Sequence, residues 1–538
     1  MDPLIIAVLG LLAIAAAAAL GPRLRVAAPL LLVLLGVAVS LLPAVPPFHV
    51  EPEWILAGVL PPLLYSASVS MPAMDFRREF GAIAGLSVAL VVVSSLVLGV
   101  FFAWAVPGLG LAWGVALGAV VSPTDAVATS IVKRLGVSPR AVTVLEGEGL
   151  LNDATALVVL RAAIAGAAAS VSLWGVLGDF VFAVAVAAVI GAVVGRLDLL
   201  VRARVADATV NTVLSFTVPF LASVPAEELG ASGLVAAVVA GLVTGRRGPR
   251  VLPARHRLSD AQNWRAIELV LEGAVFLVMG LELETVVGDV RTDHAGIGTA
   301  VAVAAGALLL TVLVRAAYVA PLLAGLRRRA RRGERMKPRL SRMLEQLDDP
   351  TAAESEFRRG PGRNRPPSAT RLARMRARVL RVGADIDHFL AQPLGWREGA
   401  VVVWAGMRGA VTLAAAQTLP EDTPSRSLLV FVAFLVAATS LLLQGGTLPR
   451  LVTWVRPARA EPDSPAERAR LAALLQQARD TVPAGPDTRY LVAVIGAQRQ
   501  ALLDARDDGA FGAETLTAAL AVLDADQVRL ELRGGPVD

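Results

Sequence analysis

The stretch EGEGLLNDATALVVL, residues 146–160, carries four polar side chains at the start of an apolar run. In a helix, Glu148 and Asn152 share one face, Glu146 and Asp153 share another, and the two faces adjoin. Carboxylates beside a carboxamide offer hard oxygen ligands, which suit Na⁺, K⁺ or H⁺ better than a transition metal. We therefore expect all four side chains to point into one sector that holds a monovalent cation or a proton.

A second polar cluster, SPTDAVA at residues 122–128, interrupts another apolar run. Pro123 lacks an N–H group and disfavours helix in the residue before it, so Ser122, Pro123 and Thr124 are expected to break the helix. Such a break persists in a membrane where it lines a cavity, and its carbonyl groups or the Thr124 hydroxyl can coordinate a cation beside Asp125. The alternative is an ordinary proline kink in which Asp125 caps the following helix.

A third cluster, GMRGAV at residues 406–411, places Arg408 between Gly406 and Gly409 in the middle of an apolar run. We expect a second helix break here, far along the chain from the first. Short interruptions at corresponding places in two halves of a chain indicate a transporter built from inverted repeats, with its site near the membrane midplane.

Arg315 lies deep in another apolar run, LLLTVLVRAAYVA. A charged side chain inside a bilayer costs about 2.5–3.5 kcal/mol on insertion scales. Because this arginine is too far from either surface to reach water easily, we expect it to pair with a carboxylate. The candidates are Glu148 and Asp125.

The elements that position these residues are predicted to be membrane-spanning helices. The chain has 538 residues, of which 55% are hydrophobic and none is cysteine, so disulfide and thiol chemistry are absent. Its mean hydropathy is +0.63. The start MDPLIIAVLG has no basic segment, which predicts a retained membrane helix rather than a cleaved signal peptide. Apolar runs long enough to cross a bilayer are expected near residues 4–21, 26–43, 54–71, 81–106, 111–133, 141–166, 173–195, 209–223, 231–245, 264–283, 296–323, 399–418 and 427–446.

The loops between these thirteen runs alternate in charge, with arginine-rich loops on one side and short neutral or acidic loops on the other. By the positive-inside rule, the N-terminus lies outside and the C-terminus in the cytoplasm of a bacterial cell. We divide the chain into membrane helices at 1–323 and 399–455, a basic cytoplasmic loop with a disordered centre at 324–398, and a cytoplasmic tail at 456–538. The tail is expected to form two or three amphipathic helices.

Several motifs in this order resemble one known family. They are LPPLLYSAS, SPTDAVA, EGEGLLNDATALVV, AEELGASGLVAAVVAG, FLVMGLELE and GMRGAV. The sequence over residues 1–455, apart from the basic loop, is similar to the bacterial monovalent cation/proton antiporters of the NhaP and NHE sodium/proton exchanger type. The resemblance implies an all-α membrane protein of about thirteen helices with inverted repeats and two broken, crossing helices. It also implies a dimer-forming panel, a mobile core and a homodimer in the plasma membrane.

The resemblance also implies roles for individual residues. Asp153 would be the carboxylate that binds the cation and the proton, with Asn152 as its partner and Thr124 and Asp125 as contributors from the unwound helix. A bound Na⁺ or K⁺ would thus contact Asp153 and Thr124. The supporting residues would be Glu148 and Arg315, as a structural salt bridge, and Arg408, at the second crossover near Asp125. Two positions depart from some relatives, which carry a serine where this chain has Gly149 and an acidic residue where it has Ser66.

The predicted function is exchange of Na⁺ for H⁺ by competition at Asp153, without net charge movement and without a cofactor. The expected partners are membrane lipids and a second copy of the chain, with no nucleic acid, and nothing in the sequence identifies a partner of the tail. The main alternative is K⁺/H⁺ exchange, because residue types do not define ligand geometry. Three further alternatives are an intramembrane aspartyl protease using Asp125 and Asp153, a channel lined by the same residues, and a membrane sensor that does not transport. The protease is disfavoured because the Gly-x-Gly-Asp pattern expected of such enzymes is absent.

Overall fold

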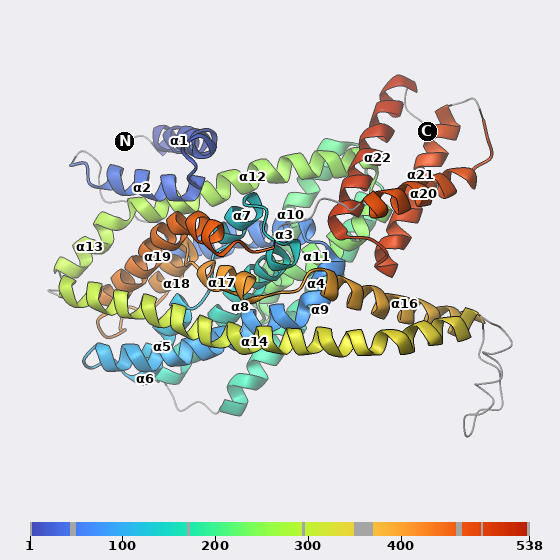
Figure 1. Cartoon of the computed structure of the whole chain (residues 1–538). Helices are drawn as coiled ribbons and strands as arrows, with labels where there is room; N and C mark the ends of the chain where they lie inside the picture. The colour runs from blue at the N-terminus through green and yellow to red at the C-terminus, as the bar shows by residue number, and fades with distance from the viewer. Residues whose placement is uncertain are drawn as a thin grey trace. The chain divides into compact units, whose positions relative to one another are not determined.

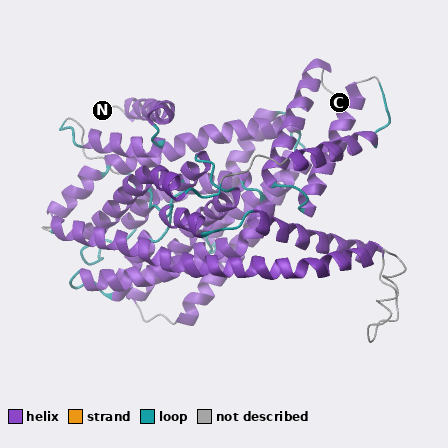
Figure 2. Ribbon diagram, viewed as in Figure 1, coloured by secondary structure: helices purple, strands orange, loops and turns teal. Residues whose placement is uncertain are grey.

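The computed structural model describes residues 3–43, 50–168, 173–292, 296–348, 369–458, 465–485 and 488–534. Every regular element in these ranges is a helix, as Figure 2 shows. The helices, labelled in Figure 1, follow one another with short connections. Their number and apolar character agree with the predicted all-α membrane class.

The elements up to residue 168 are α1 (Pro3–Leu24), α2 (Ala28–Ser40), η1 (Trp54–Val59), α3 (Leu60–Ser70), α4 (Ala73–Ala84), η2 (Gly85–Leu90), α5 (Val91–Ala105), α6 (Leu111–Val121), α7 (Val127–Arg134) and α8 (Pro139–Ala168). The elements from residue 173 to residue 348 are α9 (Leu173–Arg202), α10 (Ala208–Glu228), α11 (Gly233–Val251), α12 (Ala254–Leu281), α13 (Leu283–Thr292) and α14 (Ile297–Asp348). The remaining elements are α16 (Ala369–Ala391), α17 (Trp396–Trp404), α18 (Ala410–Gln417), α19 (Arg426–Val455), α20 (Pro465–Asp480), α21 (Thr488–Asp508) and α22 (Ala513–Gly534).

Each predicted apolar run coincides with one helix or with two or three consecutive helical elements. Among the described residues, seven helices are long and apolar enough to cross a membrane by themselves. Other predicted spans are divided, because a short apolar helix such as α6 continues in a second helix after a break. The chain is therefore a multi-pass membrane protein, and the count of thirteen spans stays a prediction.

The basic segment after the eleventh run differs from the expected loop. Helix α14 continues without interruption to Asp348, and α16 covers residues 369–391. Arginine, leucine, methionine and glutamate are good helix formers, so this composition favours helix as well as a cytoplasmic location. The segment GPGRNRPPS, predicted to be disordered, lies outside the described residues.

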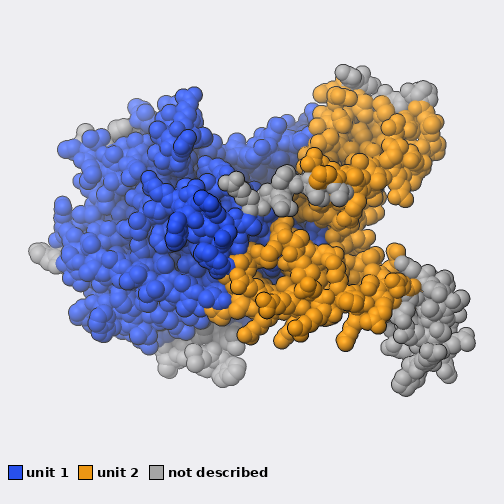
Figure 3. All heavy atoms as spheres, in the orientation of Figure 1, with its two compact units in different colours: residues 1–320, 396–460 blue, residues 321–395, 461–538 orange. Residues whose placement is uncertain are grey.

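The chain divides into two compact units, coloured in Figure 3. Unit 1 comprises residues 1–320 and 396–460, and unit 2 comprises residues 321–395 and 461–538. The described part of the tail forms three helices, α20, α21 and α22, around a small apolar core that includes Leu502, Phe511 and Leu516. The segment predicted as a basic loop thus belongs to the same unit as the tail.

Within unit 1, the helices pack as two groups. The crossover bundle contains α4 to α8, with η2, and α17 to α19; in it, α5 packs along α6, and α4 and α6 pack on α8. The companion bundle contains α1 to α3, with η1, and α9 to α12; in it, α11 packs on α3, α9 and α10, and α12 packs on α2. Glycines permit the closest approach, since a Cβ atom at Gly118 of α6 would clash with the Ser95 carbonyl oxygen of α5.

Candidate functional site

The two predicted helix breaks are present in the crossover bundle, and they meet. Helix α6 ends at Val121 and α7 begins at Val127, while α17 ends at Trp404 and α18 begins at Ala410. The amide of Asp125 in the first break donates a hydrogen bond of 2.8 Å to the carbonyl oxygen of Met407 in the second. The two breaks, which are far apart in the chain, therefore cross each other and are joined by a backbone hydrogen bond.

Charged side chains satisfy the bare helix ends at this crossing. Arg408 donates from Nε to the Val121 carbonyl at 2.9 Å and from Nη2 to the Ser122 carbonyl at 3.2 Å, and it also bonds the Gly406 carbonyl. A cation at the C-terminal end of α6 compensates the partial negative charge of that helix end. On the other side of the break, Asp125 Oδ1 accepts from the Val127 amide at 2.8 Å and caps α7. Asp125 thus has the capping role that was weighed as the alternative, and it has this role inside a true break.

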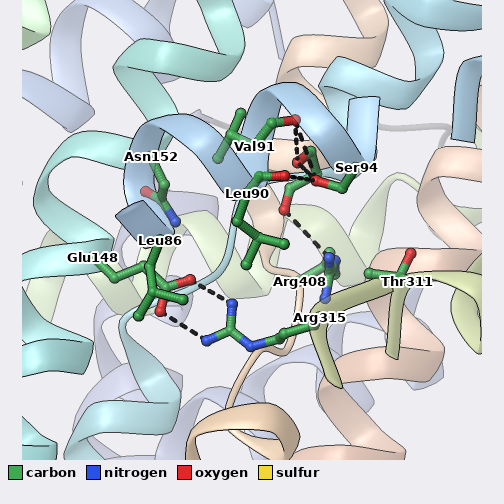
Figure 4. Close-up of a pocket in the computed structure, with 10 residues that line it drawn as sticks. Leu86, Leu90, Val91, Ser94, Glu148, Asn152, Thr311, Arg315 and Arg408 are labelled. Atoms are coloured by element: carbon green, nitrogen blue, oxygen red, sulfur yellow. Dashed lines mark hydrogen bonds and ion pairs between the residues drawn. The ribbon is translucent and has the colours of Figure 1, made fainter. Parts of the chain in front are cut away.

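Glu148 on α8 forms an ion pair with Arg315 on α14. Arg315 Nη1 and Nη2 contact the two carboxylate oxygens of Glu148 at 2.5 and 2.7 Å, and Figure 4 shows this fork. The side chains are only 3% and 2% exposed. Arg315 also donates from Nε to the Val402 carbonyl at 3.0 Å, and Thr124 donates its hydroxyl to Glu148 at 3.1 Å. Of the two carboxylates considered for Arg315, the structure pairs it with Glu148.

Asn152 is joined to the broken helix and not to the carboxylate of Asp153. Its Nδ2 donates to the Thr124 carbonyl at 2.8 Å and to the Thr124 hydroxyl at 2.9 Å. Its Oδ1 accepts from the backbone amide of Asp153 at 2.7 Å. The Asn152 side chain therefore binds Thr124 instead of pairing with the Asp153 carboxylate as expected, because the unwound segment between α6 and α7 passes beside this face of α8.

The two polar faces of α8 line two separate cavities. The expectation that all four polar side chains point into one sector is therefore wrong. Glu148 and Asn152 line a water-sized pocket of about 10 Å³ together with Ser94 and Arg408 (Figure 4). Glu146 and Asp153 line a separate cavity of about 360 Å³. The contacts of Thr124 with Glu148 and Asn152 place the unwound segment between α6 and α7 against that face of α8. Only the face with Glu146 and Asp153 is therefore open to the larger cavity.

Of the three carboxylates in this part of α8, Asp153 is the one without a partner, since Glu146 pairs with Lys133 and Glu148 with Arg315. Its side chain lines the 360 Å³ cavity, the residue is 9% exposed, and its carboxylate oxygens have no hydrogen-bond or ion-pair partner among the described residues. Thr124 and Asp125 line the same cavity, so both predicted contributors from the break are brought to Asp153. A buried carboxylate without a partner is costly in apolar surroundings unless it binds a proton or a cation.

The cavity runs from Asp153 to a charged opening. Lys133 and Glu146 line it and pair with each other at 3.3 Å, with side chains 65% and 29% exposed, which places them at its mouth. The companion bundle supplies the facing wall, including Glu268 and Glu272 of α12. These two glutamates were not predicted as site residues, although a carboxylate pair four residues apart in a predicted span is a visible signal in the sequence.

The two positions that depart from some relatives differ in location. Gly149 lines the cavity, and a Cβ atom there would meet no other atom within 4 Å. Ser66 is buried and is not among the residues that line this cavity. No group of three or more histidine, cysteine, aspartate or glutamate side chains among the described residues is arranged to hold a metal ion. Beside the helix break the cavity instead offers the free carboxylate of Asp153 together with Thr124, whose oxygen atoms are hard ligands, which suits a monovalent cation.

The known proteins that this chain resembles are cation/proton exchangers. The family model described as "Sodium/hydrogen exchanger, transmembrane" matches residues 9–347 and 368–454. A protein named as an uncharacterized Na⁺/H⁺ exchanger in Mycobacterium tuberculosis is 31% identical over 451 residues, which cover 81% of this chain and 72% of that protein. A sodium, potassium, lithium and rubidium/H⁺ antiporter of Bacillus subtilis is 30% identical over 276 residues, which cover 50% of this chain and 41% of that protein.

A solved structure has a similar fold. The sodium proton antiporter MjNhaP1 from Methanocaldococcus jannaschii matches with a TM-score of 0.57 and 16% identity, covering 84% of this chain and 98% of that one. At this identity the match concerns the arrangement of the helices and not the side chains of the site. It agrees with an all-helical membrane fold.

Proposed function

This chain belongs to the sodium/hydrogen exchanger family, and from that premise we propose that it exchanges Na⁺ for H⁺ at the single carboxylate of Asp153. The family consists of transporters, so the chain is a secondary antiporter and not an enzyme, and the aspartyl protease alternative is withdrawn. The observation that carries the role of Asp153 is its isolation: it is nine-tenths buried, unpaired among the described residues, and open to a cavity.

The charges around the site support an exchange without net charge movement. Glu148 is neutralised by Arg315. Asp125 caps α7, and Arg408 compensates the end of α6 at the same crossing. These four charges sum to zero, so among the residues that the crossover bundle brings to the site, Asp153 alone carries an uncompensated charge. Bound to either H⁺ or Na⁺ the site is neutral, whereas an empty site would carry a charge that costs several kcal/mol at membrane depth.

This balance explains why the two ions are coupled. A loaded site, with H⁺ or Na⁺, crosses the barrier between the two membrane faces, and an unloaded one does not. One Na⁺ moves in one direction for each H⁺ that moves in the other. Asn152 and Glu148 act by holding Thr124, and thereby the unwound strand, beside Asp153.

We further propose that the cavity opens to the cytoplasm. Its mouth lies at Lys133, in the last turn of α7, beside one of the basic connections that the positive-inside rule assigns to that side. With this orientation the N-terminus is outside, unit 2 is cytoplasmic, and the described conformation has its site facing inward. A homodimer in the bacterial plasma membrane remains part of the proposal.

The test uses purified protein in liposomes with a pH-sensitive dye, titrated separately with Na⁺, K⁺ and Li⁺. We expect a Na⁺-driven proton flux that disappears in Asp153→Asn and persists in the control Asp207→Asn, an exposed residue outside the cavity. Equal or larger flux with K⁺ would favour K⁺/H⁺ exchange, the activity suggested by the potassium in the name of the Bacillus relative.

Stoichiometry is measured in the same liposomes by setting a membrane potential with valinomycin and K⁺ gradients. The initial rate of Na⁺/H⁺ exchange should not depend on the potential. A rate that rises with an imposed potential would refute one-for-one exchange, and full activity in Asp153→Asn would refute the site.

A further inference from the structure

Glu268 and Glu272 line the cavity that contains Asp153, and the exchange described above does not use them. They lie one turn apart on α12, so their side chains project from the same face. Both residues are partly buried, and neither has a hydrogen bond or ion pair with any described residue. A carboxylate that is half-buried, unpaired and directed into an ion pathway requires a physical explanation.

The charges in the cavity wall are strongly one-sided. Among the described residues, Lys133 is the one basic residue that lines the cavity, and it is already paired with Glu146 at the mouth. Glu268, Glu272 and Asp153 remain, and all are acidic, whereas the charge of Asp125 is balanced by that of Arg408 at the crossing. A cleft with charges of one sign and apolar walls focuses the field and raises the local concentration of counter-ions.

The two ends of this pathway are carried by different bundles. Asp153 lies on α8 of the crossover bundle, whereas Glu268 and Glu272 lie on α12, which packs with α1, α2 and α10 of the companion bundle. Any movement of the crossover bundle against the companion bundle that carries Asp153 toward the opposite face changes its distance from Glu272. The field of Glu272 therefore acts on the site in the cavity-open state and not equally in the other state.

We propose that Glu272, assisted by Glu268, is a positioning residue that raises the apparent affinity for Na⁺ on the cavity side of the membrane only. This proposal rests on the exchange at Asp153 proposed above. The negative charge attracts Na⁺ and H⁺ alike, so it raises the affinity for both on that side and leaves the equilibrium of the exchange unchanged. At a pH at which few protons occupy Asp153, the antiporter thereby has a lower Michaelis constant for Na⁺ arriving from the cavity side than it would have with Asp153 alone.

The experiment compares Glu272→Gln with wild type in liposomes of defined orientation, measuring initial exchange rates with Na⁺ supplied first on the cavity side and then on the other side. The side that receives Na⁺ is kept at an alkaline pH at which few protons compete for Asp153. We expect the KM for Na⁺ on the cavity side to rise up to about tenfold, the low end of the range for electrostatic focusing in a cleft. The KM on the opposite side and the rate at saturating Na⁺ should stay within about twofold of wild type. The rise in KM should shrink in high choline chloride, because salt screens the field.

Three controls make the result specific. Glu284→Gln removes an exposed charge from α13 outside the cavity and should leave both KM values unchanged. Glu272→Asp keeps the charge and should restore most of the affinity. If Glu272→Gln does not yield a monodisperse protein in gel filtration, Glu268→Gln, one turn nearer the N-terminal end of α12, should show a smaller rise in KM on the same side.

An equal rise in KM on both sides, an unchanged KM, or a lower maximal rate with unchanged KM would each overturn the proposal. These outcomes differ from failure of the proposed function. If Asp153→Asn still exchanges ions, the binding site itself is wrong, whereas a normal Glu272→Gln beside an inactive Asp153→Asn refutes only the role of Glu272.

Discussion

Removing the charge of Arg315 tests how far this buried ion pair holds the membrane part together. Arg315 and Glu148 are joined by two contacts of 2.5 and 2.7 Å, with side chains 3% and 2% exposed. Arg315→Met leaves the Glu148 charge without its partner, and Glu148→Gln leaves the Arg315 charge without its partner. Loss of one partner from a buried pair costs about 3–5 kcal/mol, so each single variant should lose that much free energy of unfolding.

The double variant separates the charge effect from the packing effect. If the two losses were independent, they would add to about 6–10 kcal/mol. Both charges are absent from the double variant, while the amide introduced by Glu148→Gln still offers an oxygen to the Thr124 hydroxyl. The main loss is the hydrogen bond from Arg315 to the Val402 carbonyl, which we estimate at about 1–3 kcal/mol for an unsatisfied buried acceptor. The double variant should therefore be more stable than either single variant.

The free energy of unfolding is measured by titrating detergent-solubilised protein with sodium dodecyl sulfate, and the folded fraction is checked by gel filtration. The exposed pair Lys133 and Glu146, 3.3 Å apart, provides the matched control: Lys133→Met, Glu146→Gln and their double variant should each change stability by at most about 1 kcal/mol. Additive losses within about 0.5 kcal/mol in the Arg315 and Glu148 cycle would show that the two charges do not stabilise each other, and the reasoning would fail.

Two further predictions use matched variants. A methyl group at Gly409 would overlap the carboxylate of Asp125, whereas one at Gly149 would meet nothing within 4 Å. Gly409→Ala should therefore lose about 1–3 kcal/mol of stability and reduce exchange at least about tenfold, while Gly149→Ala keeps its stability and its exchange rate. Gel filtration and liposome flux measure the two properties, and the opposite ranking of the two variants would contradict the crossover geometry. Outside the spans, hydrogen bonds from the Val210 amide first, and then from that of Thr209, lower the pKa of Asp207 below its ordinary value of 3.8. A lowered pKa gives stability that is present above pH 3.8 and is lost as pH falls through the folded pKa. The melting temperature of wild type should therefore exceed that of Asp207→Ala at neutral pH but not at acidic pH, whereas the difference between Asp207→Asn and Asp207→Ala should not depend on pH in this range. A wild-type advantage that stays constant with pH would disprove the ionised cap.

Local chemistry determined the elements of this protein from the sequence. The apolar runs predicted helices because a backbone in hydrocarbon must satisfy its own hydrogen bonds. Pro123 and the glycines around Arg408 predicted the two breaks, because the loss of an amide donor or of a Cβ atom acts within a few residues of the chain. The order of the motifs predicted the family, which the comparisons confirm.

Only the tertiary structure decided which side chains face one another. Helical periodicity placed Glu148 and Asp153 on adjoining faces of α8, but the path of the unwound strand at Thr124 assigned them to separate spaces. The choice of Glu148 over Asp125 as the partner of Arg315 depended on where α14 passes α8. A charge in a sequence shows that a partner is required, but distances between helices determine the partner.

The same limit explains the residues that were missed. Glu272 is one glutamate among many in the sequence, and it became a candidate because α12 brings it into the cavity of Asp153. Likewise, the composition of residues 324–348 predicted a basic cytoplasmic segment but not its continuation as α14, since arginine-rich sequences suit both a solvated loop and a helix. Packing between segments distant in the chain, which no local pattern encodes, decided both.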